Sequence, residues 1–175
     1  MTMKKTFLFI LTAMVACCFF SCKEKNDPDN GNNKSDEMYV DLGLPSRTLW
    51  KSSNEVNGNH SSGLFTFDEA VNKFGQQLPT KEQCQELIDL CTWSLTFEGN
   101  KVIGPNKKYI ILPADGYIEK GEDTVEENGE AGIYWTSAPS GTDGAWCMGF
   151  EPNNKEIYIE GDQPRSDRYS VRLVK

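Results

Sequence analysis

The sequence has very few of the side chains that most enzyme mechanisms use. It contains a single histidine, His60, in a polar segment, so a zinc site or a Ser–His relay would have to be built around one imidazole. It has no Gly-x-Ser-x-Gly, phosphate-loop or His-Glu-x-x-His pattern. Its many carboxylates include no pair that the setting singles out for glycoside hydrolysis. We therefore expect a protein that is not an enzyme and carries no cofactor.

Positive charge is also scarce. The 175 residues include 18 Lys and Arg against 26 Asp and Glu, which gives a formal net charge of −8, and they contain no basic cluster. Nucleic acids and anionic lipid headgroups bind through clustered positive charge, so we expect neither as a partner. The length suits one domain with its own core and short additional segments.

One long apolar run is present, at 7–20, and it follows two lysines and precedes Cys22. At about fourteen residues, the run is shorter than the roughly twenty that a membrane-spanning helix needs. With the small residue before the cysteine, this pattern predicts a lipoprotein signal peptide over 1–21 and lipidation of Cys22. An ordinary secretory signal, in which the cysteine is incidental, is the alternative.

Residues 22–37 contain no large apolar side chain. Such a segment cannot offset its ordering entropy by burial, so we expect a flexible tether. Its early Lys23, Glu24 and Lys25 resemble signals that send Bacteroidetes-type lipoproteins to the outer face of the outer membrane, although a plain spacer has a similar composition. We expect a cell-surface protein that contacts the outer membrane only through its lipid.

Two capping boxes mark the starts of short helices within residues 38–175. Thr66 and Thr80 are each followed, three residues later, by Glu or Gln. The first helix should run from Phe67 to near Gly75. The second should bury one stripe of side chains at helical spacing, namely Cys84, Leu87, Ile88 and Cys91.

Short segments separated by Gly, Pro and Asn predict strands. Two precede the helices, and the later ones are expected at 93–97, 101–103, 109–112, 133–137, 145–150, 156–160 and 169–174. Early helices and late strands predict an α+β domain with two short helices packed on a twisted, mainly antiparallel sheet and with long surface loops. The large side chains assigned to its core are Trp50, Trp93, Trp135, Trp146, Met148 and Phe150.

Several motifs occur in the order found in one bacterial family. They are Tyr-Val-Asp-Leu-Gly-Leu-Pro-Ser at 39–46, Thr-Leu-Trp at 48–50, Leu-Pro-Thr-Lys-Glu at 78–82, Gly-Ile-Tyr-Trp-Thr-Ser at 132–137 and Ser-Val-Arg at 170–172. Through them, nearly the whole chain after the tether resembles the Fibrobacter succinogenes major paralogous domain family.

The resemblance implies a C-type lectin-like fold, in which the N- and C-terminal strands pair, two helices pack on the sheet, and a loop-rich region faces outward. Arg47 and Arg168 stand where the family usually has glycine, and Leu173 stands where it usually has proline. A glycine can take a positive φ at no steric cost, so Arg168 leaves the local turn undetermined. The variable insertion after the first tryptophan is also short.

The tripeptide Glu151-Pro152-Asn153 has the spelling that sugar-binding C-type lectins use to hold calcium and sugar together. Calcium needs six to eight converging oxygen ligands, and one connection between two strands cannot supply them. The next strand also lacks the Trp-Asn-Asp segment that completes such sites. We therefore interpret 151–154 as a hairpin turn, with Glu151 and Asn153 as subsidiary metal candidates.

Ligand-binding residues are expected on loops and on exposed rings. The acidic segment 119–130 lacks the oxygen spacing of an EF-hand, so we interpret it as a solvated loop that could carry recognition. A second loop is expected at 138–144. The candidate ligand-binding residues are Tyr117, Tyr158, Glu122, Asp123 and Asp143.

Three cysteines follow the tether: Cys84, Cys91 and Cys147. On one helix, Cys84 and Cys91 would have α-carbons roughly 10 Å apart, which is too far for a disulfide. Either could pair with Cys147, and the sequence does not decide between pairing and free thiols. We interpret all three as small buried apolar residues.

These observations predict a surface-tethered domain that binds a glycan or a protein through loops at 113–132, 138–144 and 161–167. Two other hypotheses stand beside this one. The first is a structural or accessory subunit of a surface assembly. The second is an oxidase of the formylglycine-generating type, whose fold is related and which uses paired cysteines, although nothing here matches its cysteine segment.

Overall fold

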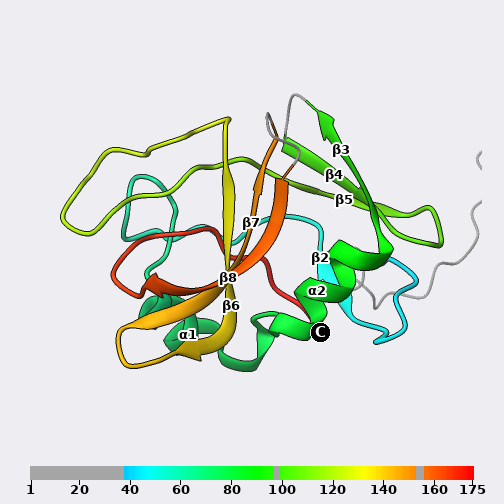
Figure 1. Cartoon of the computed structure of the whole chain (residues 1–175), viewed down its shortest axis with the longest axis horizontal. Coiled ribbons are helices and arrows are strands. Elements are labelled where there is room, and N and C mark those ends of the chain that lie inside the picture. Colours follow the sequence, from blue (N-terminus) through cyan, green and yellow to red (C-terminus); the bar gives the residue numbers. More distant parts are fainter. Residues whose placement is uncertain (1–37, 97–98, 153–155) are drawn as a thin grey trace, which may run out of the picture. The chain divides into compact units, whose positions relative to one another are not determined.

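The computed structural model describes residues 38–96, 99–152 and 156–175, which form a small α+β domain (Figure 1). The predictions for the signal peptide, Cys22, the tether and Asn153 lie outside the described residues. In chain order the elements are β1 (Tyr39–Asp41), β2 (Leu49–Lys51), α1 (Phe67–Phe74), the 3-10 helix η1 (Gly75–Gln77), α2 (Lys81–Leu90), β3 (Thr92–Thr96), β4 (Gly99–Ile103), β5 (Tyr109–Leu112), β6 (Gly132–Ser140), β7 (Gly144–Glu151) and β8 (Glu156–Pro164).

Both α-helices begin at the predicted capping boxes. The Thr66 hydroxyl accepts a hydrogen bond from the Glu69 amide at 3.3 Å, and the Glu69 carboxylate accepts one from the Thr66 amide at 2.9 Å. Thr80 and Gln83 make the same reciprocal pair at the start of α2. Each box satisfies amides that a helix start leaves without partners, which fixes where the helix begins. The buried side chains are Phe67 and Ala70 on α1 and Cys84 and Leu87 on α2.

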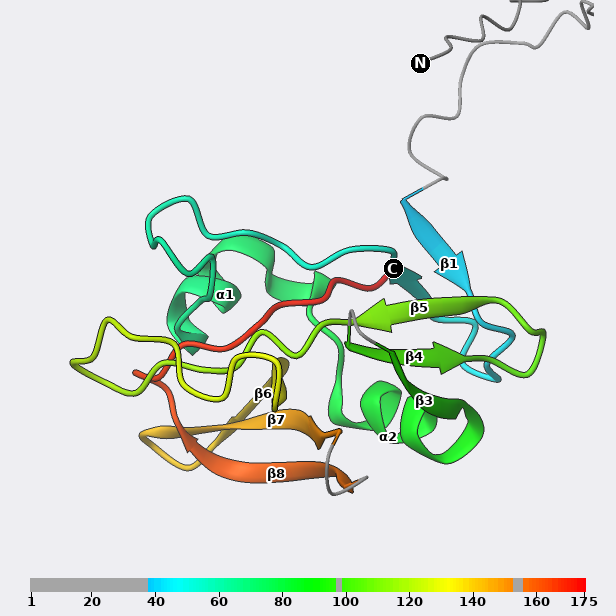
Figure 2. The same cartoon turned by 90° about the horizontal axis from the view of Figure 1, so that it is seen from above.

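The described strands form three separate antiparallel sheets, not the one sheet that the sequence predicted, and their orders are β1-β2, β3-β4-β5 and β6-β7-β8 (Figure 2). Strand β6 extends to Ser140 and β8 to Pro164, beyond their predicted ends. The register of β6 against β7 shifts between Trp135 and Pro139, and pairing then continues to Ser140 and Gly144. Such a bulge lets the ladder include the proline. The predicted loops 138–144 and 161–167 are therefore shorter than expected.

The C-terminal segment is not the continuous strand predicted at 169–174. It makes isolated bridges with different neighbours, among them Val174 with Trp50 of β2 and Ser170 with Tyr134 of β6. The segment changes partners along its length, so no single ladder can form beside it. Its end lies beside β2, where Leu49 and Lys175 exchange backbone hydrogen bonds.

Sheet β6-β7-β8 lies between two hydrophobic clusters. Met148 and Phe150 of β7 pack with Trp50 and residues of α2 in the first cluster. Cys147 packs with Trp135 and the aromatic residues around α1 in the second. Successive side chains of a strand point to opposite faces, so both faces of this sheet are covered by core.

Trp146 is not the core residue that alternation predicted. It is half-buried, and the register between β7 and β8 shifts at its position. The Lys81 ammonium lies 3.3 Å from the centroid of its ring, which is a cation–π contact. Trp50 and Trp135 are buried as predicted, and Trp93 is half-buried against the first cluster.

A buried arginine joins segments that the separate sheets leave apart. Arg172 is 1% exposed and donates three hydrogen bonds. Its Nε bonds Asn54 Oδ1 at 2.8 Å, Nη1 bonds the Lys51 carbonyl at 2.7 Å, and Nη2 bonds the Ile111 carbonyl at 2.6 Å. The C-terminal segment is thereby linked to β2, to the residues after β2, and to β5.

The same network continues beyond the guanidinium. Asn54 Nδ2 donates to Asp115 Oδ2 at 2.8 Å, and the Tyr134 hydroxyl donates to the Pro113 carbonyl at 2.7 Å. Burial lowers the pKa of Arg172 from its ordinary value, while Tyr134 and Asp115 oppose the shift. A charge buried in this way is retained only because its donors are satisfied.

We expect Arg172→Met to lower the free energy of unfolding by about 3–5 kcal/mol, because it removes a buried charged group and leaves two half-buried carbonyls and the half-buried Asn54 side-chain oxygen without this donor. The matched control is Arg168→Met. The one polar contact that the Arg168 side chain makes with another described residue is at 4.0 Å, with the fully exposed Asp123, so replacing Arg168 should cost about 1 kcal/mol or less. Urea unfolding measures both; equal losses in the two variants would contradict the role assigned to Arg172.

Candidate functional site

Three loops meet at one polar hollow with a volume of about 480 Å³, which we call the three-loop hollow. Each of the three segments predicted to carry recognition contributes to its lining, and the start of α1 completes it. The lining residues are Lys120 from the first segment, Thr142 and Asp143 from the second, Arg165 and Ser166 from the third, and Thr66 and Asp68.

Backbone hydrogen bonds hold these loops against one another. The Arg165 amide donates to the Asp143 carbonyl at 3.0 Å, and the Arg165 carbonyl accepts from Phe67 at the start of α1 at 3.1 Å. The Lys120 amide donates to Asp167 Oδ1 at 3.0 Å. Burial raises the pKa of Asp167 above its ordinary value, and the bond from Lys120 opposes that shift. The hollow is therefore formed before any ligand arrives.

The side chains of the hollow offer hydrogen-bond donors and acceptors, and they include positively and negatively charged groups. The Arg165 guanidinium lies over the Phe67 ring, 4.7 Å from its centroid, and its buried Nε has no hydrogen-bond partner among the described residues. Nη1 is 3.9 Å from the exposed Asp68 carboxylate, a pair that contributes little in water. Such a set, without a large apolar side chain, suits a ligand rich in hydroxyl groups.

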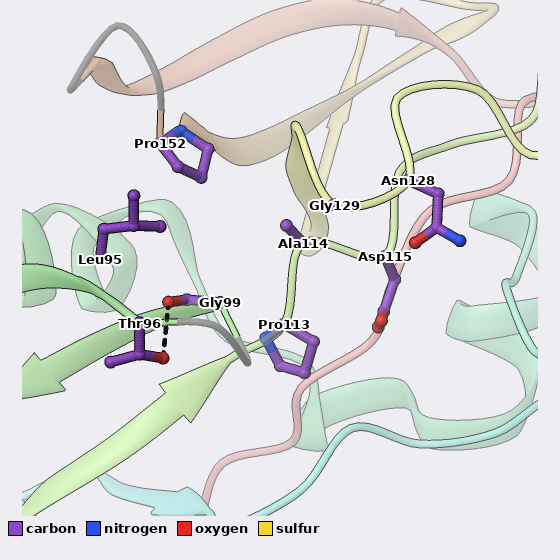
Figure 3. Close-up of a pocket in the computed structure, with 9 residues that line it drawn as sticks. All are labelled: Leu95, Thr96, Gly99, Pro113, Ala114, Asp115, Asn128, Gly129 and Pro152. Carbon is purple, nitrogen blue, oxygen red and sulfur yellow. Dashed lines mark hydrogen bonds between the residues drawn. The ribbon is translucent and has the colours of Figure 1, made fainter.

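A second concave region, the central groove, consists of three adjoining hollows of about 200, 310 and 470 Å³. The smallest lies between the other two and is drawn in Figure 3, where Leu95 and Pro152 face each other at one end and Asp115 and Asn128 stand at the other. It shares the first pair with one neighbouring hollow and the second pair with the other.

Of the five predicted binding residues, only Asp143 lines the three-loop hollow. Glu122 and Asp123 are exposed in the acidic loop, with Asp123 fully in solvent. The hollow also uses Lys120 and Arg165, which the sequence did not single out. Their only signal was membership of the predicted segments, because their convergence depends on the tertiary fold.

Tyr117 and Tyr158 were expected to be exposed, and that expectation is wrong. Tyr117 is half-buried and packs edge-on against Tyr169, with ring centroids 6.4 Å apart. Tyr158 is also half-buried, and its ring covers Gly149: a Cβ there would lie 2.4 Å from Cζ. Burial, with nearby Cys147 and carboxylates, raises the pKa of Tyr158 to about 12. Tyr158 alternates with Ile157 and Ile159, which pack on the first hydrophobic cluster, so its ring lies on the face of the sheet that carries the second cluster.

The subsidiary calcium candidates do not form a site in the described structure. Glu151 is half-buried at the end of β7, and Asn153 lies outside the described residues. Among the residues that are described, no group of three His, Cys, Asp or Glu side chains is placed to hold a metal ion. His60 instead bonds Glu69 at 2.9 Å, which ties its loop to α1.

The three cysteines of the domain are free thiols. Burial raises the pKa of Cys91 to about 11 and that of Cys147 to about 12, and it raises the pKa of Cys84 further. A thiol attacks as its thiolate, so these cysteines are poor nucleophiles near neutral pH. Cys84 and Cys147 are buried as predicted, whereas Cys91 at the end of α2 is half-buried.

Alkylation should reflect this order. In native protein at pH 8, we expect iodoacetamide to modify Cys91 slowly and to leave Cys84 and Cys147 unmodified until the chain is unfolded. Peptide mass spectrometry identifies the modified residue. Raising the pH from 8 to 11 should accelerate modification of Cys91, because the fraction of thiolate increases as the pH approaches the Cys91 pKa of about 11. Rapid native modification of Cys84 or Cys147 would contradict their enclosure.

One family model matches this chain. It is that of a domain of unknown function, DUF8237, and it covers residues 93–174, from β3 to the C-terminal segment that carries Arg172. No curated protein and no solved structure matches the chain. In the described part of the chain, no helix has the length and apolar character needed to cross a membrane.

Proposed function

We propose that this protein is a non-catalytic recognition domain that binds a glycan in the three-loop hollow. The observation that carries the proposal is the convergence there of Lys120, Asp143 and Arg165 from three different segments. Their charged groups can donate to and accept from sugar hydroxyls. The backbone bonds between the loops support binding, because a site that is already formed loses less entropy when the ligand is held.

We propose further that the α+β domain has a C-type lectin-like fold of the Fibrobacter succinogenes major paralogous type. The pairing of β2 with the C-terminal residues, the two short helices and the loop-borne hollow support this assignment. The motifs at 39–46 and 132–137 support it from the sequence.

The proposed setting is the surface of the outer membrane. Lipid on Cys22, after removal of residues 1–21, would anchor the chain, and residues 22–37 would hold the domain away from the membrane. Binding from such a tether needs no cofactor and no calcium. The raised pKa values of the buried thiols disfavour the alternative of a thiol-dependent oxidase.

A glycan array tests this function with the protein and its Asp143→Ala variant. We expect retention of one or a few related glycans and roughly tenfold or greater weakening by the substitution, because a charged hydrogen-bond acceptor is lost. Only the Asp143 carbonyl takes part in the described loop frame, so alanine leaves that frame intact. Asp89→Ala on the exposed face of α2 removes the same charge and should leave binding unchanged.

The array is repeated with a calcium chelator, and retention should persist. No retained glycan, or equal retention by the Asp143 variant, would contradict the proposed site. Binding abolished by chelation would instead return Glu151 and Asn153 to consideration as calcium ligands.

A further inference from the structure

The central groove runs along the open edge of a strand. In sheet β3-β4-β5, β3 is an outer strand, and among the described strands it pairs only with β4. Three consecutive residues of β3, Trp93, Ser94 and Leu95, line the same hollow. Alternate residues of a strand share one face, so consecutive residues lining one hollow place that hollow beside the edge, where unpaired amides and carbonyls point.

The opposite wall is also strand. Glu156 and Ile157 at the start of β8 line this hollow, and β8 is the outer strand of its own sheet. Leu95 is 57% exposed although it is a large apolar residue in a strand. The Trp93 indole donates to the Leu87 carbonyl at 3.2 Å, which fixes β3 against α2. The groove thus has a firm wall with an exposed apolar side chain.

The charged side chains among the described residues that line the groove are all acidic. The described lining of the three hollows includes the carboxylates of Asp115, Glu151, Glu156 and Glu55 and no lysine or arginine. Glu55 is paired with Lys51. Asp115 Oδ2 accepts from Asn54 and Ser170 at 2.8 and 3.2 Å, which fixes a carboxylate whose Oδ1 has no hydrogen bond to another described residue.

We propose that the central groove binds an extended, basic segment of a partner protein, which adds to β3 as a further antiparallel or parallel strand. Main-chain bonds to the β3 edge supply affinity, and lysine or arginine side chains of the partner meet Glu151, Glu156 and Asp115. Apolar side chains of the partner cover Leu95. This surface is separate from the three-loop hollow, so glycan and partner bind independently.

The probe is a fluorescein-labelled peptide of nine residues in which lysine and valine alternate. Fluorescence polarisation with the full chain should show saturable binding, and a glutamate–valine peptide should not bind. Methylation of alternate peptide nitrogens should weaken binding at least tenfold, because it removes donors that a strand ladder needs. At saturation, the amides of β3 whose N–H groups point to the open edge should exchange hydrogen at least tenfold more slowly.

Two charge-matched double variants separate groove binding from attraction to an acidic protein. Glu151→Gln with Glu156→Gln should weaken peptide binding about tenfold, whereas Asp89→Asn with Glu130→Gln, both exposed and outside the groove, should change it less than twofold. Equal weakening by the two pairs would overturn the proposal. Full binding of the methylated peptide, or unchanged exchange throughout β3, would overturn it as well, whatever the glycan array shows.

Discussion

The buried guanidinium of Arg172 is the constraint on which the rest of the domain depends. The three described sheets share no ladder, and short strands such as β1 and β2 are marginal by themselves. Arg172 gives the carbonyls of Lys51 and Ile111 a common donor and holds Asn54. Since an unsatisfied buried charge costs several kcal/mol, alternative placements of the C-terminal segment are strongly disfavoured.

This framework explains why the two proposed binding surfaces lie where they do. The C-terminal segment passes between the sheets, and its residues bridge Phe65, Ile118 and Tyr134. Just before this segment, Asp167 and Arg165 hydrogen-bond the neighbouring loops and hold them together. These bonds shape the three-loop hollow. Among the described strands, none pairs with the outer edge of β3, which lies beside acidic side chains. One surface is suited to hydroxyl groups and the other to a basic strand.

Local signals predicted the fold better than the site. The capping boxes at Thr66 and Thr80 act within one turn, so the sequence sufficed to place both helices. The predictions that Trp146 is buried and that Tyr158 is exposed assume a regular ladder with one solvated face. In the structure the pairing of β7 is irregular at Trp146, and both faces of the sheet are covered. The sequence predicted the three loops as binding segments but no hollow between them, and Arg165 could not be chosen in advance, since its place in the hollow comes from contacts between distant segments.

Native-state hydrogen exchange tests the central claim most directly, namely that the Arg172 segment and the sheets unfold as one unit. The amide of Lys51 donates to Leu173, and that of Val174 donates to Gln77. We predict that both exchange only through global unfolding, with the same free energy as the Met148 amide in the core strand β7. Exchange of Lys51 and Val174 through a local opening several kcal/mol easier than that of Met148 would contradict the account.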